Sequence, residues 1–312
     1  MARIVTLTAN PALDYYVEAD AVAPNHKIRC DHARADAGGG GINVARAAHR
    51  LGAKTVAIFP AGGPYGAALV AAIEKEAVPH RVIPIKGETR IAFAARDRAA
   101  GDEYRFGLAG PALSSQEIEA LLAAAREETK AGDFVIGSGS LPPGAPADFW
   151  ARAAKDARKN GAKFALDSSM GESEALAAGL YLLRKNKLEL ANLAGRALSW
   201  PNEVERFAHD FVSKENVEKL VVTHGADGAL MASADGSVLA PAHDVVIVSA
   251  VGAGDSFVAA LIDALMRGES DARALRWGMA AASATLTTPG TALFDPAMVE
   301  DLFERDPRAT LS

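Results

Sequence analysis

Residues 251–256 (Val-Gly-Ala-Gly-Asp-Ser) place an anion-binding backbone and a carboxylate directly before an apolar helical run. At a helix start, the N–H groups of Gly252, Ala253 and Gly254 are free to bind an anion, and the helix dipole adds to the attraction. Asp255 would repel that anion, unless it takes a proton from a hydroxyl while the amides hold charge on a transferring phosphoryl group. The alternative is an Asp N-cap after a glycine-rich turn.

A second glycine-rich segment covers residues 38–41 and precedes a predicted helix. Four glycines let the backbone pass close to a ligand, and Asn43 offers both a donor and an acceptor for adjacent sugar hydroxyls. A dinucleotide fingerprint fails because Asn43 stands where the third glycine belongs. The chain contains no G-x-x-x-x-G-K-[ST] sequence, which excludes a P-loop. A flexible glycine linker is the other alternative, and the helix that follows disfavours it.

Basic residues gather in two segments of mixed polarity: Lys27, Arg29, Arg90 and Arg105. Arginine binds phosphate with a planar fork of donors, and lysine acts as a point charge. If the two segments fold together, these cations form a pocket for a sugar phosphate. Taken singly, each of them is also typical of a solvated surface charge.

Three polar loops follow predicted strands. Ser138 begins a rigid loop at the carboxyl end of a buried strand, where open α/β sheets bind ligands, although a plain strand-to-helix turn has the same pattern. Asn186 and Glu189 lie one helical turn apart and suit the water shell of Mg²⁺, although a helix cap would look identical. Residues 223–228 lie between two predicted strands and suit a nucleotide phosphate or ribose, or a hairpin turn.

Short β-branched runs alternate with alanine-rich helical stretches, which predicts an α/β protein with a mainly parallel sheet covered on both faces. The predicted strands cover residues 4–8, 55–59, 134–136, 164–166, 181–183 and 220–223. The predicted helices cover residues 42–51, 65–76, 116–130, 146–160, 203–214, 255–267 and 271–286. Two extended segments, roughly 14–35 and 88–106, interrupt this alternation and predict a small β-sheet lid inserted into a single domain of residues 1–312.

Composition narrows the function classes. A formal net charge of −6 argues against a nucleic-acid partner, whose binding needs a basic surface. The single cysteine, Cys30, excludes an internal disulfide and a multi-cysteine zinc site. No uncharged apolar run approaches the length of a membrane span, and the N-terminus has no signal-peptide pattern. We therefore expect a cytoplasmic protein with no membrane partner.

Taken in order, the motifs resemble those of the ribokinase-type sugar kinases, in particular the phosphofructokinase B branch. The resemblance runs from residues 6–8 to residues 289–291 and is strongest in segments 38–46, 58–63, 104–106, 138–144, 167–169 and 251–256. Within this branch the chain is most similar to the minor, ATP-dependent 6-phosphofructokinases. The four glycines and the segment 27–30 support this choice, because 1-phosphofructokinases and tagatose-6-phosphate kinases usually carry lysine or another residue where Gly40 stands.

The resemblance implies a ribokinase-like three-layer αβα core, ATP and Mg²⁺ as cosubstrate and metal, and a site for a monovalent cation such as K⁺. It implies that Asp255 is the base and that residues 252–254 form the anion hole. The residues implied in sugar-phosphate binding are Asp14, Lys27, Gly39, Asn43, Arg90, Arg105 and Ser138. The residues implied at ATP are Asn186, Thr223, Gly225 and Gly228, with Glu189 near Mg²⁺ and Ser249, Val251 and Gly290 at the monovalent cation.

The implied activity is ATP-dependent phosphorylation of fructose 6-phosphate at its 1-hydroxyl, in a homodimer formed through the lid, with Lys27 contributing across the interface. Fructose 1-phosphate and tagatose 6-phosphate are alternative substrates, since both are ketohexose phosphates. A catalytically idle sugar-phosphate sensor is a more remote alternative. A nucleoside kinase is disfavoured, because nucleosides carry no phosphate for Arg90 and Arg105.

Three positions depart from the family pattern. Arg184-Lys185 stands where the family usually has Lys-Pro before the asparagine of N-x-x-E. Ala250 replaces a threonine before the anion-hole segment, and Thr288 replaces an asparagine near the nucleotide wall. These changes affect the expected ATP contacts and give the sensor its support. They leave the predicted base and anion hole intact.

Overall fold

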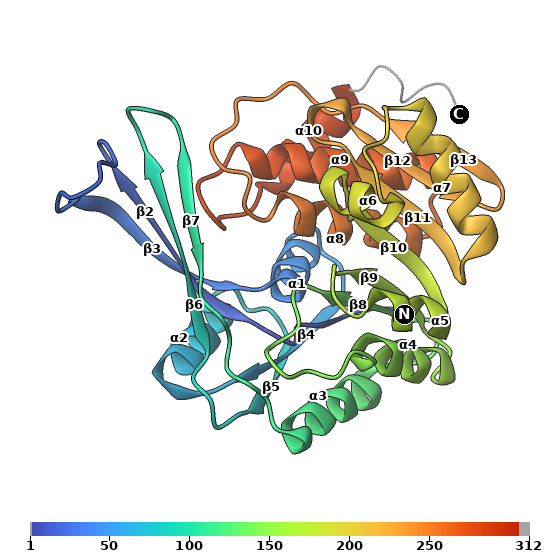
Figure 1. The fold of residues 1–312 in the computed structure, drawn as a ribbon, viewed down its shortest axis with the longest axis horizontal. Helices are drawn as coiled ribbons and strands as arrows, with labels where there is room; N and C mark the ends of the chain where they lie inside the picture. The colour runs from blue at the N-terminus through green and yellow to red at the C-terminus, as the bar shows by residue number, and fades with distance from the viewer. Residues whose placement is uncertain (1, 306–312) are drawn as a thin grey trace.

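The computed structural model describes residues 2–305 and shows an α/β molecule built around one large sheet (Figure 1). Within the described residues, the strands of this sheet run in the order β13-β12-β11-β10-β9-β8-β1-β4-β5. All neighbours pair in parallel except β12, which is antiparallel to both β11 and β13. The strands are β1 (Ile4–Leu7), β4 (Thr55–Ala61), β5 (His80–Pro84), β8 (Phe134–Ser138), β9 (Lys163–Asp167), β10 (Leu180–Asn186), β11 (Val217–Thr223), β12 (Ala229–Ser233) and β13 (Gly236–Ala240).

Helices cover both faces of the large sheet. Successive strand residues point to opposite faces, so Ile4 packs with α1, α8, α9 and α10 while Val5 packs with α3, α4, α5 and α7. This is the predicted three-layer αβα core. The helices are α1 (Gly40–Arg50), α2 (Gly63–Lys75), α3 (Ser115–Glu128), α4 (Phe149–Lys159), α5 (Glu172–Ala178), α6 (Lys187–Ala194), α7 (Asn202–Lys214), α8 (Ala253–Met266), α9 (Asp271–Leu286) and α10 (Pro296–Arg305).

A separate four-stranded sheet projects from one side of the core (Figure 1). Its strands are β2 (Ala12–Ala19), β3 (Cys30–Gly38), β6 (Arg90–Asp97) and β7 (Glu103–Gly107), in the order β3-β2-β6-β7. We call this sheet the lid. Because β2 begins five residues after β1 ends, the base of the lid lies beside the carboxyl ends of the core strands. Arg96 of the lid donates a hydrogen bond to the carbonyl of Val248 in the core.

Each strand and helix predicted from periodicity is present, with ends that differ by a few residues. The sequence patterns do not predict the strands β5 and β13 or the helices α5 and α10. Both strands are short edge strands with several partly exposed residues, so neither has the continuous apolar run of a buried strand. None of the helices among residues 2–305 is both long and apolar enough to cross a membrane.

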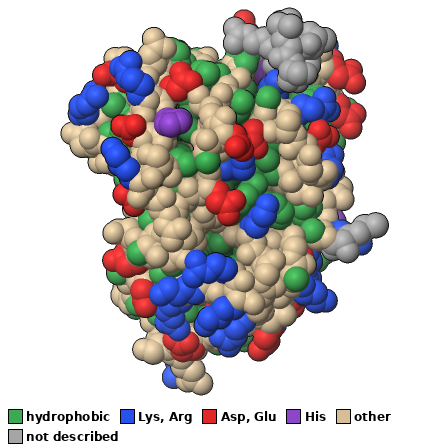
Figure 2. All heavy atoms as spheres, turned by 90° about the vertical axis from the view of Figure 1, so that its right-hand side faces the viewer, with side chains coloured by type: hydrophobic (Ala, Val, Ile, Leu, Met, Phe, Trp, Pro, Cys, Tyr) green, Lys and Arg blue, Asp and Glu red, His purple; other side chains and the backbone are tan. Residues whose placement is uncertain are grey.

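Basic side chains gather in the lower part of the face shown in Figure 2, among acidic ones. The helix α4, which lies on this side of the molecule, carries Arg152, Lys155, Arg158 and Lys159. Part of this charge is paired, since Arg152 forms an ion pair with Glu119 of α3. None of the described α4 residues lines the cavities of about 970 Å³ and 340 Å³ that form the candidate site, so these cations lie outside it.

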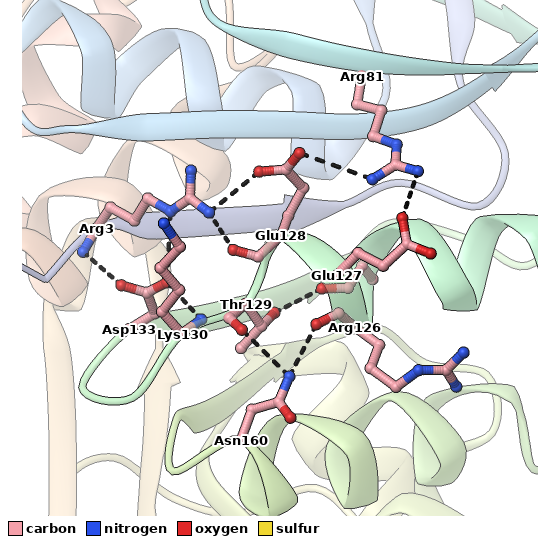
Figure 3. A network of polar contacts seen from close by, with 10 residues as sticks. Arg3, Arg81, Arg126, Glu127, Glu128, Thr129, Lys130, Asp133 and Asn160 are labelled. Carbon is pink, nitrogen blue, oxygen red and sulfur yellow. Dashed lines mark hydrogen bonds and ion pairs between the residues drawn. The ribbon is translucent and has the colours of Figure 1, made fainter.

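A polar network joins the first strand to the loop after α3 (Figure 3). The backbone N–H of Arg3 donates to Asp133 Oδ1 at 3.0 Å, and the Arg3 side chain forms ion pairs with Asp133 and Glu128. The side chain of Asp133 is 3% exposed, whereas the neighbouring pair of Arg81 with Glu127 is 37% and 58% exposed. The two pairs therefore share their chemistry and differ in burial.

We expect Arg3→Met to lower the free energy of unfolding by about 1–2 kcal/mol, because it removes a charged partner from a buried carboxylate. The control Arg81→Met removes an exposed pair and should cost less than about 1 kcal/mol. Urea denaturation measures both. Equal losses in the two variants would contradict the role assigned to burial.

Candidate active site

Two cavities meet at the segment 250–255. The larger has a volume of about 970 Å³ and is lined by Ala250, Ala253 and Gly254 on this side. The smaller has a volume of about 340 Å³, lies between the lid and the core, and is lined by Val251, Gly252 and Asp255. The predicted anion-binding segment is therefore the wall that the two cavities share.

The start of α8 presents free amide groups at this wall. Gly252 is the N-cap and has φ of 77°, in the left-handed region that favours glycine. The first backbone hydrogen bond of the helix is donated by the N–H of Ser256 to the carbonyl oxygen of Gly252. Among the described residues, the N–H groups of Gly252, Ala253 and Gly254 donate to no acceptor. Because α8 runs for 14 residues, its dipole adds to the pull of these groups on an anion.

Asp255 lies beside the free amides and opens onto the smaller cavity. Burial, followed by the negative charge of Asp167, raises the pKa of its carboxyl to about 7, while the hydrogen bond from Asn43 and the charge of Arg184 oppose the rise. A carboxyl with such a pKa can accept a proton near neutral pH. The raised pKa also explains how Asp255 and an anion site can lie side by side, since a protonated carboxyl carries no charge to repel the anion.

Asn43 orients this carboxyl. Its Nδ2 donates to Asp255 Oδ2 at 2.9 Å, and its Oδ1 accepts from Arg46 at 3.2 Å. Arg46 is fully buried and also donates to the carbonyls of Ala37 and Thr291. One N–H and one lone pair of the Asn43 amide remain for a ligand. The sequence predicts Asn43 at the sugar hydroxyls and does not indicate its bond to Asp255, which joins residues 212 positions apart.

The smaller cavity combines cations with a carboxyl. Asp14, Gly39, Arg90 and Arg105 all line it. Burial raises the pKa of Asp14 to about 6, against the opposing charge of Arg90, and burial also lowers the pKa of Arg90. Gly39 has φ of 111°, and a methyl group there would lie 2.9 Å from the Thr8 side chain, so the cavity wall needs glycine at this position. The arrangement suits a ligand with both hydroxyl and anionic groups.

The larger cavity has apolar walls and one polar end. Its apolar lining includes Leu188, Val245, Ile247, Ala282 and Leu286, which suits a flat aromatic base. The residues predicted to contact ATP, Asn186, Thr223, Gly225 and Gly228, line the same cavity. The residues that line this cavity therefore fit a nucleotide. Its base would lie among the apolar residues, and its phosphates would point toward α8.

Asn186 and Glu189 form a capping box at the start of α6. Asn186 Oδ1 accepts from the Glu189 N–H at 2.9 Å, and Glu189 Oε2 accepts from the Asn186 N–H at 2.9 Å. This is the helix cap that the sequence left open as an alternative. Within the described residues, Oε1 of Glu189 makes no hydrogen bond, so one carboxylate oxygen is left that fits the water shell of Mg²⁺.

The three residues predicted at a monovalent cation come together around the turn before α8. Ser249 is buried and its Oγ accepts from the Val251 N–H at 3.2 Å, while Val251 and Gly290 line the smaller cavity. In the described part of the chain, no donor reaches the carbonyl oxygens of Ser249, Val251 and Gly290. Unpaired carbonyl oxygens are the donors that a hard cation prefers.

Four predicted site residues line neither of the two cavities: Lys27, Ser138, Glu189 and Ser249. Lys27 is exposed in the loop between β2 and β3, at the end of the hairpin remote from Asp14. Ser138 is buried. It packs behind Gly40, which lines the smaller cavity, and a methyl group on Gly40 would lie 2.3 Å from the Ser138 Oγ. The Ser138 hydroxyl instead donates to Asp167 at 3.5 Å.

In the sequence, Arg184 is a departure from the family pattern and has no predicted place in the site. The structure puts its guanidinium against Gly254, where a methyl group would lie 2.9 Å from Nη2. Tyr16 is a second site residue that the sequence does not predict. It lines the smaller cavity and packs against Gly290. Tyr16 is the second residue after Asp14, and alternation along a strand places both side chains on one face, which is a weak signal in the sequence.

Comparison with known proteins gives the fold and the site a family. Residues 7–298 match the model of the pfkB family of carbohydrate kinases. The ATP-dependent 6-phosphofructokinase isozyme 2 of Mycobacterium tuberculosis is 42% identical over 302 residues, which cover 97% of this chain and 89% of that protein. The chain belongs to the pfkB family of carbohydrate kinases.

Other relatives agree with this membership. The Escherichia coli ATP-dependent 6-phosphofructokinase isozyme 2 is 38% identical over 296 residues, covering 94% of this chain and 95% of that protein. A crystal structure of Escherichia coli phosphofructokinase-2 with substrates and products has a TM-score of 0.92 and 35% identity, over 97% of this chain and 99% of that chain. A Haloferax volcanii 1-phosphofructokinase is 31% identical over 293 residues, covering 94% and 93% of the two chains.

We expect kcat/KM of this kinase to rise with pH through an apparent pKa of about 7 and then to level off, because the carboxyl of Asp255 must lose its proton to act as a base. Activity is lost as the pH falls through that value. Initial rates between pH 5.5 and 9 measure the profile.

The variant Asn43→Ala provides the control, because it removes a hydrogen bond that lowers the pKa of Asp255. Its acid limb should move to higher pH, whereas a limb caused by ionisation of the substrate would stay in place. A rate independent of pH between 6 and 8 would contradict the assignment.

Proposed function

We propose that this protein transfers the terminal phosphoryl group of ATP to the 1-hydroxyl of fructose 6-phosphate. The observation that carries the proposal is the shared wall 250–255, with a nucleotide-sized cavity on one side and an arginine-lined cavity on the other. Free amides and a carboxyl of raised pKa lie at the point where the two cavities meet. Phosphoryl transfer needs this combination of electrostatic stabilisation and positioning.

The cations of the smaller cavity support a phosphorylated sugar. Arg90 and Arg105 present guanidinium groups, which pair with phosphate in a planar, bidentate way. In this proposal they bind the 6-phosphate, while Asp14, Gly39 and Asn43 bind the hydroxyls. Ser138 stays a predicted contributor near the phosphate. An unphosphorylated sugar or nucleoside would bring no phosphate to these two guanidinium groups, which contact only protein groups: Arg90 donates to the carbonyls of Asn10 and Leu108, and Arg105 pairs with Glu103.

The residues of the larger cavity support ATP as the donor. Thr223, Gly225 and Gly228 would hold the phosphates, and Asn186 and Glu189 would organise the water shell of Mg²⁺. When bound, Mg²⁺ neutralises charge on the phosphates. A monovalent cation such as K⁺ would bind at the carbonyl oxygens around Ser249. Escherichia coli phosphofructokinase-2, which is 36% identical over 97% of this chain, has been solved with potassium.

Asp255 takes the proton of the 1-hydroxyl as its oxygen attacks the terminal phosphorus. The new O–P bond forms while the bond from phosphorus to the bridging oxygen of ATP breaks, and ADP leaves. The N–H groups of Gly252, Ala253 and Gly254 hold the charge on the phosphoryl oxygens during the transfer. Asn43 fixes the direction of the Asp255 carboxyl throughout.

The alternative substrates are fructose 1-phosphate and tagatose 6-phosphate. Among the relatives, proteins named 6-phosphofructokinase reach higher identity than those named 1-phosphofructokinase, at 42% and 31%, which favours fructose 6-phosphate. An idle sugar-phosphate sensor is disfavoured by the bond between Asn43 and Asp255, because a sensor needs no oriented base. Release of ADP with the three sugar phosphates in parallel, compared by kcat/KM, distinguishes all four possibilities.

We expect Asp255→Asn to lower kcat by at least about 100-fold, because an amide cannot take the proton from the hydroxyl. Binding of fructose 6-phosphate, measured by isothermal titration calorimetry, should change by less than about threefold. Asp263→Asn is the matched control: Asp263 is also buried on α8, but it pairs with Arg267 and lies outside both cavities. Turnover retained by Asp255→Asn would rule out the proposed mechanism.

We also propose a homodimer formed through the lid. Lys27 and Arg29 lie at the exposed end of the β2–β3 hairpin, where they face no cavity of their own chain. Pairing of two lids would carry Lys27 to the site of the partner chain. The charge of Lys27 would then help bind an anionic group there.

We expect Lys27→Ala and Asp255→Asn to complement each other when the two inactive variants are unfolded together and refolded as a mixture. A mixed dimer has one site with both native residues, so about a quarter of the sites regain activity at equal amounts. Sedimentation velocity confirms the dimer. No recovery in mixed dimers would show that Lys27 does not act across the interface.

A further inference from the structure

Arg184 joins the carboxyl ends of three neighbouring strands. It lies on β10, and its Nη1 donates to Asp167 Oδ1 of β9 at 3.2 Å. Its Nη2 donates to Thr223 Oγ1 of β11 at 2.7 Å. The side chains of Arg184 and Asp167 are only 12% and 10% exposed. The guanidinium is therefore fixed in position before any ligand arrives.

The guanidinium lies at the junction of the two cavities. Arg184 lines the larger cavity, and its Nη1 and Nη2 would lie 3.2 Å and 2.9 Å from a methyl group placed on Gly254. It therefore contacts the backbone that presents the free amides. Its Nε is buried and has no hydrogen-bond partner among residues 2–305. A buried, unpaired donor of a charged group is costly unless a ligand satisfies it.

We propose that Arg184 is a catalytic residue that binds the phosphoryl group while it passes from one cavity to the other. This inference rests on the proposed function, because it assumes that a phosphoryl group crosses the wall 250–255. The guanidinium would contact the phosphoryl oxygens beside the amides of Gly252–Gly254, since it lies against Gly254. The departure from the family's lysine then supplies a planar donor fork in place of a point charge.

The bonds formed and broken are those of the proposed phosphoryl transfer. The proton of the acceptor hydroxyl goes to Asp255, the new O–P bond forms as the bond to the bridging oxygen breaks, and the electron pair leaves with ADP. Arg184 neither gains nor loses a proton. Its charge stabilises the oxygens of the phosphoryl group during the transfer.

A structural role for Arg184 makes different predictions. If the guanidinium only ties β9, β10 and β11 together, its removal lowers stability and weakens the binding of all ligands alike. If it binds the phosphoryl group in transfer, its removal weakens the transition state more than the bound substrates. A complex of ADP, Mg²⁺, aluminium fluoride and fructose 6-phosphate mimics the transition state, and its affinity can be compared with that of ADP alone.

The test compares Arg184→Met and Arg184→Lys with the native enzyme. We expect Arg184→Met to lower kcat by about 100-fold or more, which is the loss seen when a preorganised charge donor is removed. The KM for fructose 6-phosphate and the affinity for ADP should change by less than about threefold. The affinity for the aluminium fluoride complex should fall about as far as kcat. Arg184→Lys should bind this complex about tenfold more tightly than Arg184→Met, because lysine keeps the positive charge and loses the planar fork of donors.

The pH profile adds an independent readout. Asp167, Arg184 and Asp14 are the charged neighbours that act on Asp255, along with the hydrogen bond from Asn43. Removing Arg184 raises the pKa of Asp255, so the acid limb moves to higher pH in Arg184→Met. Asp167→Asn removes a negative charge and moves the limb the other way. A melting temperature for each variant shows whether the fold is retained.

A loss of less than about threefold in kcat, or equal losses in affinity for ADP and for the aluminium fluoride complex, would overturn the inference. The fluoride complex is measured by calorimetry and needs no turnover. If the native enzyme prefers another sugar phosphate, the proposed substrate fails and the same comparison is made with that sugar. A native enzyme that turns over none of them refutes the proposed function separately from Arg184.

Discussion

The free N–H groups at the start of α8 are the constraint on which the rest of the site depends. Gly252 takes the left-handed conformation that begins the helix, and the following amides have no acceptor in the described chain. Such groups attract an anion, and Asp255 in the same turn would repel one. The conflict is resolved by burial, which raises the pKa of this carboxyl to about 7 and allows it to hold a proton. An anion site and a proton acceptor can thus share one turn of helix.

The core places every other part of the site around that turn. Parallel strands end at one edge of the sheet, so Asp167, Arg184 and Thr223 meet there from three adjacent strands. Of these three residues, Arg184 lies against Gly254. The lid closes the other side, where Tyr16 packs against Gly290. Burial and then the charges of Asp167 and Asp14 raise the pKa of Asp255, while Asn43 and Arg184 lower it, so residues of the core and the lid together set this pKa.

Sequence patterns predicted the parts of the site that are local. The amides and carboxyl of residues 252–255 lie in one turn, and the pairing of Asn186 with Glu189 spans three residues, so both were visible in the chain. The bond from Asn43 to Asp255 and the contact of Arg184 with Gly254 join residues that only the fold brings together. Periodicity predicted the buried strands and missed the edge strands β5 and β13, whose exposed residues break the apolar run. In the proposed dimer, Lys27 acts at the site of a partner chain, and no pattern within one chain can show where that site lies.

The most direct test of the central claim is a crystal structure with ADP, Mg²⁺, aluminium fluoride and fructose 6-phosphate. The account predicts that the fluoride group lies at the N–H groups of Gly252–Gly254, with the 1-hydroxyl oxygen of the sugar about 3 Å from a carboxylate oxygen of Asp255. A fluoride group bound elsewhere, or a sugar whose 1-hydroxyl points away from Asp255, would contradict it.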